Sequence, residues 1–356
     1  MRTIVCLALS AWLAICAGSQ AAVLEVGPDK SYRTISEGAS AASPGDTLLV
    51  YPGIYAEADL FLKEGTTLAG TGRDKTIIAY DGAMSTGNIL SCSDGTVIRG
   101  CWLIGAPTYP VRGFRECAFE LRNCVIWGNA RALAAHYPES RVVFTNCTVF
   151  GNEEGIVCEN GSSVELRNTV VYGNTSNVAG DVANISATNC NIEGGWPGEG
   201  NIDADPLFVN PQELDYCEVV SAPSSGALTT NLRLKPASPC IDAGFNDPEL
   251  PETDIAGMHR IMYGGKSRTV DMGAYEYYIN ELEPGPGAEE ATLTWSSLGD
   301  RSYSILYSED LLTWHLAIES FPSAGYQTTS WIDDGSKTGV RPWLAPRRFY
   351  RILENP

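Results

Sequence analysis

Positive charge is scarce in this sequence, in which 24 Lys and Arg residues stand against 43 Asp and Glu residues. The formal net charge of −19 argues against nucleic acid as a partner and against unaided attachment to anionic membranes. Charged residues make up only 19% of the chain and hydrophobic residues 44%, which excludes wholesale disorder. Such an acidic chain is compatible with Ca²⁺ binding or with plain solubility, and no pattern in it requires a cofactor.

Long apolar runs are lacking after the first 21 residues. Residues 3–18 are apolar, but this stretch is too short to favour a spanning helix, and small residues precede Ala22 as at a signal-peptidase site. We therefore predict a signal peptide over residues 1–21. The remaining chain is expected to be secreted or at the cell surface, with no membrane-spanning segment.

The sequence has no CxxC pair and no cysteine spacing typical of zinc sites. Of its 11 cysteines, Cys6 and Cys16 lie in the predicted signal peptide, and 11 minus 2 leaves nine. An odd number in an exported chain means that at least one thiol is free or pairs between molecules.

A repeat of 21 to 23 residues is the most informative feature that is present. Each unit has short alternating runs separated by Gly and Asn, with no helical stripe, which predicts a β-solenoid whose coils stack about 4.8 Å apart. We expect a small residue and an aliphatic residue two positions later to point inward in every coil, and an Asn to stack its amide on the next Asn. These rows are Cys101, Cys124, Cys147, Thr169 and Cys190; Leu103, Ile126, Val149, Val171 and Ile192; and Asn123, Asn146, Asn168 and Asn189.

The stretch from Tyr32 to Glu57, with Pro44-Gly45-Asp46 and Pro52-Gly53, resembles the start of right-handed parallel β-helices of the pectate-lyase-like kind. The resemblance implies that residues 35–42 form a short helix over the open end. Motifs at residues 201–208, 238–244 and 271–276 resemble the choice-of-anchor Q region that closes many bacterial surface β-helices. Together these resemblances predict a β-helix domain over residues 22–280 that includes the N-terminal cap and the choice-of-anchor Q-like end.

The C-terminal part changes in composition. Residues 281–290 are rich in Pro, Gly and Glu, which predicts a linker, and residues 291–356 resemble a small fibronectin-III-like module with a β-sandwich fold. Its four Trp residues are interpreted as core, with a sugar-stacking platform as the alternative. Its basic residues suit docking onto the acidic β-helix or contact with acidic glycans: Arg341, Arg347, Arg348 and Arg351.

Known catalytic motifs of the family are absent: neither those of pectin methylesterases, nor those of polygalacturonases, nor those of pectate lyases occur in this sequence. Because the fold does not decide function, we predict an exported or cell-surface protein that binds carbohydrate or another surface partner without catalysis. The alternative is a polysaccharide lyase or glycoside hydrolase acting on an acidic polysaccharide such as pectin. The oligomeric state is left open.

Two outward rows are candidate binding surfaces. An aromatic row is expected three residues past the cysteine row and includes Trp127, Phe150 and Tyr172, unless a loop or the C-terminal module covers it. A row of Arg99, Arg122 and Arg167 is either a track for carboxylates or a set of ion pairs with Glu120 and Glu165.

A column of His136, Glu159 and Asp181 follows from an identical offset of 12 residues in successive coils. Stacked carboxyl groups with a nearby His could provide a general acid and base. Arg131 and Glu154 are candidate supporting groups, and the alternative is a solvated strand end. A further acidic set either holds Ca²⁺ or caps turns: Asp203, Asp205, Asp242, Asp254, Asp271 and Glu276.

Overall fold

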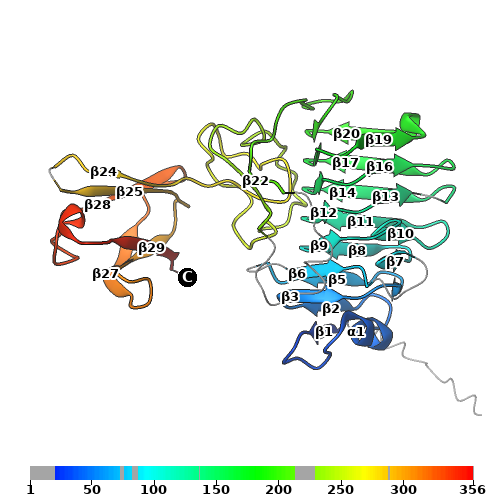
Figure 1. The fold of residues 1–356 in the computed structure, drawn as a ribbon, viewed down its shortest axis with the longest axis horizontal. Coiled ribbons are helices and arrows are strands. Elements are labelled where there is room, and N and C mark those ends of the chain that lie inside the picture. The colour runs from blue at the N-terminus through cyan, green and yellow to red at the C-terminus, as the bar shows by residue number, and fades with distance from the viewer. Residues whose placement is uncertain are drawn as a thin grey trace, which may run out of the picture.

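The structure is a computed structural model that describes residues 21–72, 76–81, 87–135, 137–212, 229–287 and 289–355. It is nearly all β, and its main body is a parallel β-solenoid of about 7 turns (Figure 1). The predicted fold class, a parallel β-helix followed by a smaller β-sandwich-like part, is confirmed. The predicted signal peptide lies outside the described residues apart from Ala21, and it stays a prediction.

Three parallel sheets form the walls of the solenoid, and each complete coil contributes one strand to each wall. Sheet A contains β1 (Val23–Val26), β2 (Thr47–Val50), β5 (Thr67–Gly70), β8 (Thr96–Arg99), β11 (Ala118–Arg122), β14 (Arg141–Thr145), β17 (Ser163–Arg167) and β20 (Ile185–Thr188). Sheet B contains β3 (Gly53–Ala56), β6 (Thr76–Ala79), β9 (Trp102–Ile104), β12 (Val125–Trp127), β15 (Thr148–Phe150), β18 (Val170–Tyr172) and β21 (Asn191–Ile192). Sheet C contains β4 (Leu60–Leu62), β7 (Leu90–Cys92), β10 (Val111–Gly113), β13 (Arg131–Ala135), β16 (Glu154–Cys158) and β19 (Ser176–Gly180).

The cysteine row is a packing row inside the solenoid, as predicted. Its members are fully buried, and the thiols point toward backbone carbonyls, as Cys124 Sγ does 3.3 Å from the Arg122 oxygen. Thr169 replaces Cys in the row because its hydroxyl makes the same contact, donating to the Arg167 oxygen over 2.9 Å. Eight cysteines in the described ranges are free thiols, and Cys217 lies outside those ranges.

The prediction placed the asparagine ladder in the wrong turn of each coil. The four predicted Asn residues have positive φ, from 48° to 52°, which Asn tolerates better than most residues. Their amides, however, mostly bond to a later segment of the chain, as Asn146 Nδ2 does when it donates to the Asp271 oxygen over 3.0 Å. Only Asn168 approaches its neighbour in the row, with Nδ2 3.5 Å from Asn146 Oδ1.

A continuous ladder of amides does exist in the turn between sheets B and C. Asn129 donates from both its backbone N and its Nδ2 to Asn152 Oδ1, over 2.9 and 3.0 Å. Asn152 repeats these two contacts with Asn174 Oδ1, over 2.9 and 2.8 Å. All three amides are buried, so this turn is held to the same shape in successive coils.

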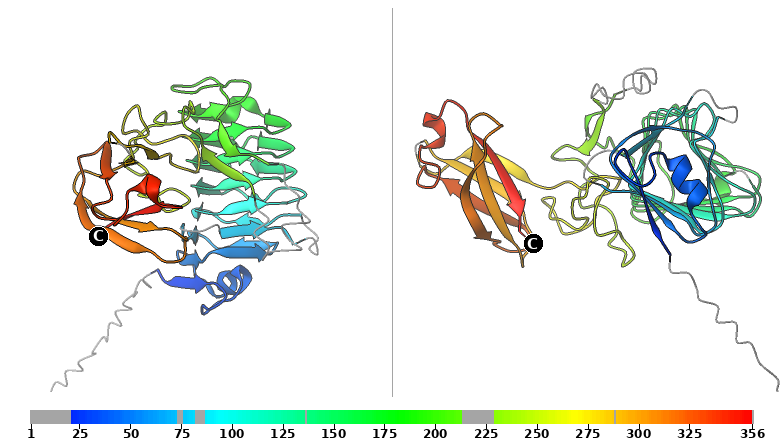
Figure 2. Two further views of the ribbon diagram at one scale, coloured as in Figure 1. Left: turned by 60° about the vertical axis from the view of Figure 1, so that its left-hand side comes forward. Right: turned by 90° about the horizontal axis from the view of Figure 1, so that it is seen from below.

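A short helix closes the N-terminal end of the solenoid, as the resemblance implied. Helix α1 (Ile35–Ala41) begins with a capping box, in which Thr34 accepts from the Glu37 amide and the Glu37 side chain accepts from the Thr34 amide. Glu57 accepts from the Ile35 and Ser36 amides, each over 2.8 Å. Seen along the solenoid axis, α1 lies across the first coil (Figure 2).

After the last coil the chain leaves the solenoid. A short 3₁₀ helix, η1 (Val182–Asn184), precedes β20, and the coils end near residue 204. The described residues between 202 and 279, termed the covering segment, then run back along the outer side of sheet B (Figure 1). This segment contains the antiparallel pair β22 (Phe208–Asn210) and β23 (Asn231–Leu234).

Two three-stranded antiparallel sheets form the C-terminal module. The predicted linker is wrong, because residues 280–284 form strand β24, which pairs along its whole length with β25. Trp295 and Trp331 are buried with Leu293, Tyr303 and Ile305, which confirms the core interpretation for these two Trp residues. One sheet holds β24 (Asn280–Pro284), β25 (Ala291–Ser296) and β28 (Thr328–Asp333), the other β27 (His315–Pro322), β26 (Ser302–Ser308) and β29 (Phe349–Glu354), and η2 (Pro342–Leu344) precedes β29.

Candidate functional site

The aromatic row on sheet B faces away from the solenoid core, as predicted, but it is covered. Trp127 is 2% exposed, and its Nε1 donates to the Gln212 oxygen of the covering segment over 3.2 Å. Phe150 packs edge-on against Phe208, with ring centroids 5.5 Å apart, and Tyr172 joins the same cluster half-buried. The row therefore forms an internal interface, and the expectation of an exposed aromatic stripe is wrong.

The arginine row on sheet A forms the ion pairs that were the alternative to a carboxylate track. Arg122 Nη2 lies 2.5 Å from Glu120 Oε2, and Arg167 Nη2 lies 2.6 Å from Glu165 Oε1. Arg141 pairs with Glu165 as well, while Arg99 is exposed. The guanidinium groups of Arg122 and Arg167 are thus already engaged.

The predicted column on sheet C brings together two of its three residues. Cys158 of β16 pairs with Ala135 of β13 and with Gly180 of β19, so Glu159 and Asp181 follow the strand ends in neighbouring coils. Both carboxylates lie near Cys158, whose thiol pKa is raised, mainly by burial and further by these two charges. His136 lies outside the described residues.

Arg131 contacts two carboxylates, one at each end of strand β16 on the outer face of sheet C. Its Nε lies 2.5 Å from Glu154 Oε2 at the start of β16, and its Nη1 lies 3.6 Å from Glu159 Oε1 just past the end of that strand. Val157, between the two carboxylates in sequence, is buried. We term these residues, with Asp181, the sheet C patch: Arg131, Glu154, Glu159 and Asp181.

A groove of about 610 Å³ adjoins the sheet C patch. It runs across successive turns between sheets B and C, beside the buried asparagine ladder, and Glu153 and Thr175 are exposed along it. Because Arg131 and Glu154 directly follow its lining residues, groove and patch are continuous. This turn groove was missed from sequence, although the repeated Gly-Asn pairs carried the signal: Gly128-Asn129, Gly151-Asn152 and Gly173-Asn174.

The acidic residues near the end of the β-helix cap backbone amides, which was the alternative to Ca²⁺ binding. Asp242 accepts from the Lys266 and Ser267 amides over 2.8 and 2.9 Å, and Asp254 accepts from Ala256 and Met258, each over 2.8 Å. Equivalent contacts to backbone amides engage the rest of the set: Asp203, Asp205, Asp271 and Glu276. Within the described ranges, no three His, Cys, Asp or Glu side chains are grouped to hold a metal ion.

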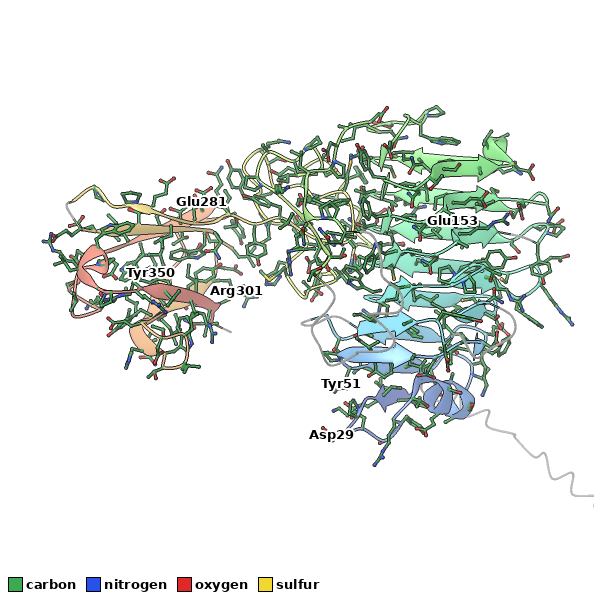
Figure 3. All side chains as sticks on the ribbon, viewed as in Figure 1. Asp29, Tyr51, Glu153, Glu281, Arg301 and Tyr350 are labelled. Carbon is green, nitrogen blue, oxygen red and sulfur yellow. The ribbon has the colours of Figure 1, made fainter. Side chains whose placement is uncertain are left out.

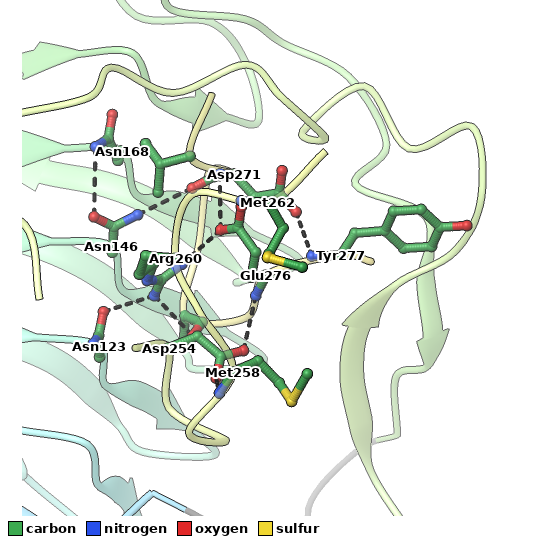
Figure 4. A network of polar contacts seen from close by, with 12 residues as sticks. Asn123, Asn146, Asn168, Asp254, Met258, Arg260, Met262, Asp271, Glu276 and Tyr277 are labelled. Atoms are coloured by element: carbon green, nitrogen blue, oxygen red, sulfur yellow. Dashed lines mark hydrogen bonds and ion pairs between the residues drawn. The ribbon is translucent and has the colours of Figure 1, made fainter. Parts of the chain in front are cut away.

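Three of these acidic residues surround Arg260 in a buried network that ties the covering segment to the solenoid (Figure 4). Arg260 Nη2 donates to Asn123 Oδ1 over 2.6 Å, and Nη1 lies 3.6 Å from Glu276 Oε2. Burial raises the pKa of Asp271 to about 7, although backbone amides and Arg260 oppose the shift. Burial also raises the pKa of Glu276. The network is therefore structural and has no access for a ligand.

Residues 77–204 match the family model of a right handed beta helix region. No curated protein sequence matches the chain. Among solved structures, the chain is similar to the crystal structure of pectate lyase Pel9A, with 14% sequence identity and a TM-score of 0.29, over 73% of this chain and 97% of that chain. A likeness at this level bears on neither substrate nor reaction. None of the described helices is long and apolar enough to span a membrane.

Proposed function

We propose that this protein is exported or displayed at the cell surface and binds carbohydrate, or another surface partner, along the turn groove and the sheet C patch, without catalysis. The observation that supports this proposal is the groove itself, which repeats the same polar turn in successive coils. A polysaccharide presents hydroxyl groups at regular intervals, and the groove holds the exposed side chains of Glu153 and Thr175 in neighbouring coils, which stack about 4.8 Å apart.

The placement of the other outer faces favours the same surface. The outer side of sheet B is occupied by the covering segment, and Arg122 and Arg167 of sheet A are engaged by Glu120 and Glu165. Sheet C has no such cover among the described residues, and its patch carries both signs of charge at the edge of a groove. Charged and amide groups of this kind orient sugars by hydrogen bonding.

The alternative function is a polysaccharide lyase or glycoside hydrolase acting on an acidic polysaccharide. The observation that favours it is the pairing of Glu159 and Asp181 in neighbouring coils beside Arg131. Against it, Glu159 contacts Arg131, and Asp181 Oδ2 accepts from the Gly161 amide over 3.2 Å. Both carboxylates thus already have partners within the chain, whereas a general acid must be placed to reach the leaving group of a substrate.

A glycan array probed with the whole exported chain tests binding, and Arg131→Ala tests the location. We expect Arg131→Ala to weaken binding about tenfold, as the loss of one charge-assisted hydrogen bond would. Arg122→Ala is the matched control, because it removes an arginine of similar exposure from a Glu pair on sheet A. If Arg122→Ala or Arg167→Ala weakened binding and Arg131→Ala did not, the site would lie on sheet A instead.

Incubation with any glycan hit, followed by detection of reducing ends or unsaturated products, separates binding from catalysis. No product is expected. Product formation that is lost in Glu159→Gln, Asp181→Asn or His136→Ala would support the enzyme alternative and overturn the proposal of a non-catalytic binder.

A further inference from the structure

The C-terminal module contains a cavity of about 630 Å³, separate from the sheet C patch. It opens between β24 and β29, the edge strands of the two facing sheets, and Met258 and Met262 of the covering segment form a third wall. Figure 3 labels Glu281 and Tyr350, which line it from the two strands. We term it the module pocket.

Aromatic rings form most of the apolar surface of the module pocket. Trp295 and Tyr303 lie deep in the module core, with ring centroids 5.6 Å apart, and Trp314 stands half-buried near the opening. Tyr278, Phe349 and Tyr350 complete this lining. Aromatic faces bind the apolar faces of flat or ring-shaped ligands.

Two buried donors in this lining have no hydrogen-bond partner within the part of the chain that the structure describes. They are Trp295 Nε1 and Arg348 Nε, and the side chains are each 4% exposed. A buried donor without a partner costs about 1–3 kcal/mol, so native structures seldom leave one empty. Both residues line the module pocket, and an acceptor oxygen of a bound ligand is the partner that either donor lacks.

The lining of the module pocket carries both signs of charge, and Arg351 is a cation in it that is available to an anion. Glu354 is engaged on two sides, 3.3 Å from His259 Nε2 and 3.3 Å from Arg301 Nε. Arg351 is exposed, stacks over the Trp314 ring at 4.3 Å and forms no ion pair with any described residue. A guanidinium held beside an aromatic face is suited to a carboxylate on a ring.

We propose that the module pocket binds a carboxylate-bearing sugar residue, with its ring against the aromatic lining, its hydroxyl oxygens toward Trp295 Nε1 and its carboxylate toward Arg351. This site would give the protein a second point of attachment to an acidic polysaccharide. It does not depend on the proposed function of the turn groove, since no residue of the sheet C patch lines it.

Binding of galacturonic acid and of galactose to the whole chain tests the proposal, because the two sugars differ at the carboxylate. Saturation-transfer NMR and calorimetry should show galacturonic acid bound at least about tenfold more tightly than galactose. Arg351→Ala should remove that preference, and Trp295→Phe, which keeps a ring but lacks the N–H, should weaken both sugars.

Arg347→Ala and Trp343→Phe are matched controls, since neither residue lines the pocket. Equal affinity for the two sugars, no binding of either, or binding unchanged in Arg351→Ala would overturn the proposal. Arg351 is exposed, so its substitution keeps the test valid even if Trp295→Phe unfolds the module. Arg131→Ala should leave this binding unchanged, which separates its outcome from that of the turn groove.

Discussion

The outer faces of sheets B and C come from the same coils yet meet opposite surroundings. On sheet B the outward residues are large and apolar, and the covering segment buries Trp102 and Ile104 fully and Tyr172 in part. On sheet C the outward groups include Arg112, Arg131 and Glu154, which stay partly exposed. An outward apolar row in a solenoid therefore signals a cover from elsewhere in the chain, whereas an outward polar row signals a free face.

The ion pairs on the two faces also differ in how deeply they are buried. Arg260 of the covering segment is 1% exposed, with two acidic neighbours that are equally buried, whereas Arg131 on sheet C pairs in partial contact with water. Ion pairs that are buried and hydrogen-bonded lose far more when broken than exposed pairs do. We therefore expect larger losses of stability from substitutions under the covering segment than from substitutions on exposed faces.

The largest expected effect is that of Arg260→Ala. It would leave Glu276 and Asp271 buried without their cation and Asn123 Oδ1 without its donor, so the free energy of unfolding should fall by about 3–5 kcal/mol. Denaturant unfolding measures this loss, with Arg131→Ala as the exposed control, for which a loss of about 0–1 kcal/mol is expected. Equal losses in the two variants would remove the distinction between the faces.

Trp127→Ala tests the cover itself. Because Trp127 packs edge-on against Trp102, with centroids 5.9 Å apart, and bonds to Gln212, its truncation should cost about 3–5 kcal/mol of stability. Limited proteolysis should then cut the covering segment faster than in the parent chain. If Trp127→Ala left stability unchanged but weakened glycan binding, the result would instead support an aromatic row that is exposed in solution.

A smaller effect is expected from pH. Asp271 has a pKa of about 7 in the folded chain against an ordinary value of 3.8, so between these values the folded state binds more protons than the unfolded state. Stability should therefore fall as pH rises from about 4 to 7, and the raised pKa of Glu276 acts in the same direction. The melting temperature should be higher at pH 5 than at pH 8.

Asp271→Asn serves as the control for the pH dependence, because the amide is neutral at every pH and keeps one oxygen as an acceptor. Its melting temperature should change less between pH 5 and pH 8 than that of the parent chain. If the two chains showed the same dependence, Asp271 would not be its source.

The interior of the solenoid could be predicted from sequence because a stacked coil turns a repeat into a physical row. The cysteine row and the aliphatic row two residues later were both placed correctly, as was the capping helix. That a later segment covers sheet B was considered only as an alternative. The sequence could not decide it, because contacts such as that of Asn123 with Thr253 join residues 130 positions apart. No local pattern encodes such a pairing.

The candidate site could be predicted only in part for the same reason. Glu159 and Asp181 were placed in neighbouring coils by counting, but the link from Arg131 to both Glu154 and Glu159 depends on the path of a long side chain. The module pocket depends on how two sheets and the covering segment meet, which the sequence of the module does not reveal. The Pro/Gly/Glu composition of residues 281–290 was misleading, because edge strands tolerate Pro and charge.

The smallest expected effect concerns the ion pairs of sheet A, whose coupling energy is the reference value for an exposed pair. Glu120 and Arg122 are neighbours on one exposed strand, so a double-mutant cycle of Glu120→Ala and Arg122→Ala should give a coupling of about 0–1 kcal/mol. Raising the ionic strength should reduce the coupling further, since salt screens exposed charges. Denaturant unfolding of the four chains at low and high salt measures it. A coupling as large as the loss in Arg260→Ala would mean that sheet A is also covered in solution, by a second molecule or by a bound partner, because an exposed pair cannot reach that strength.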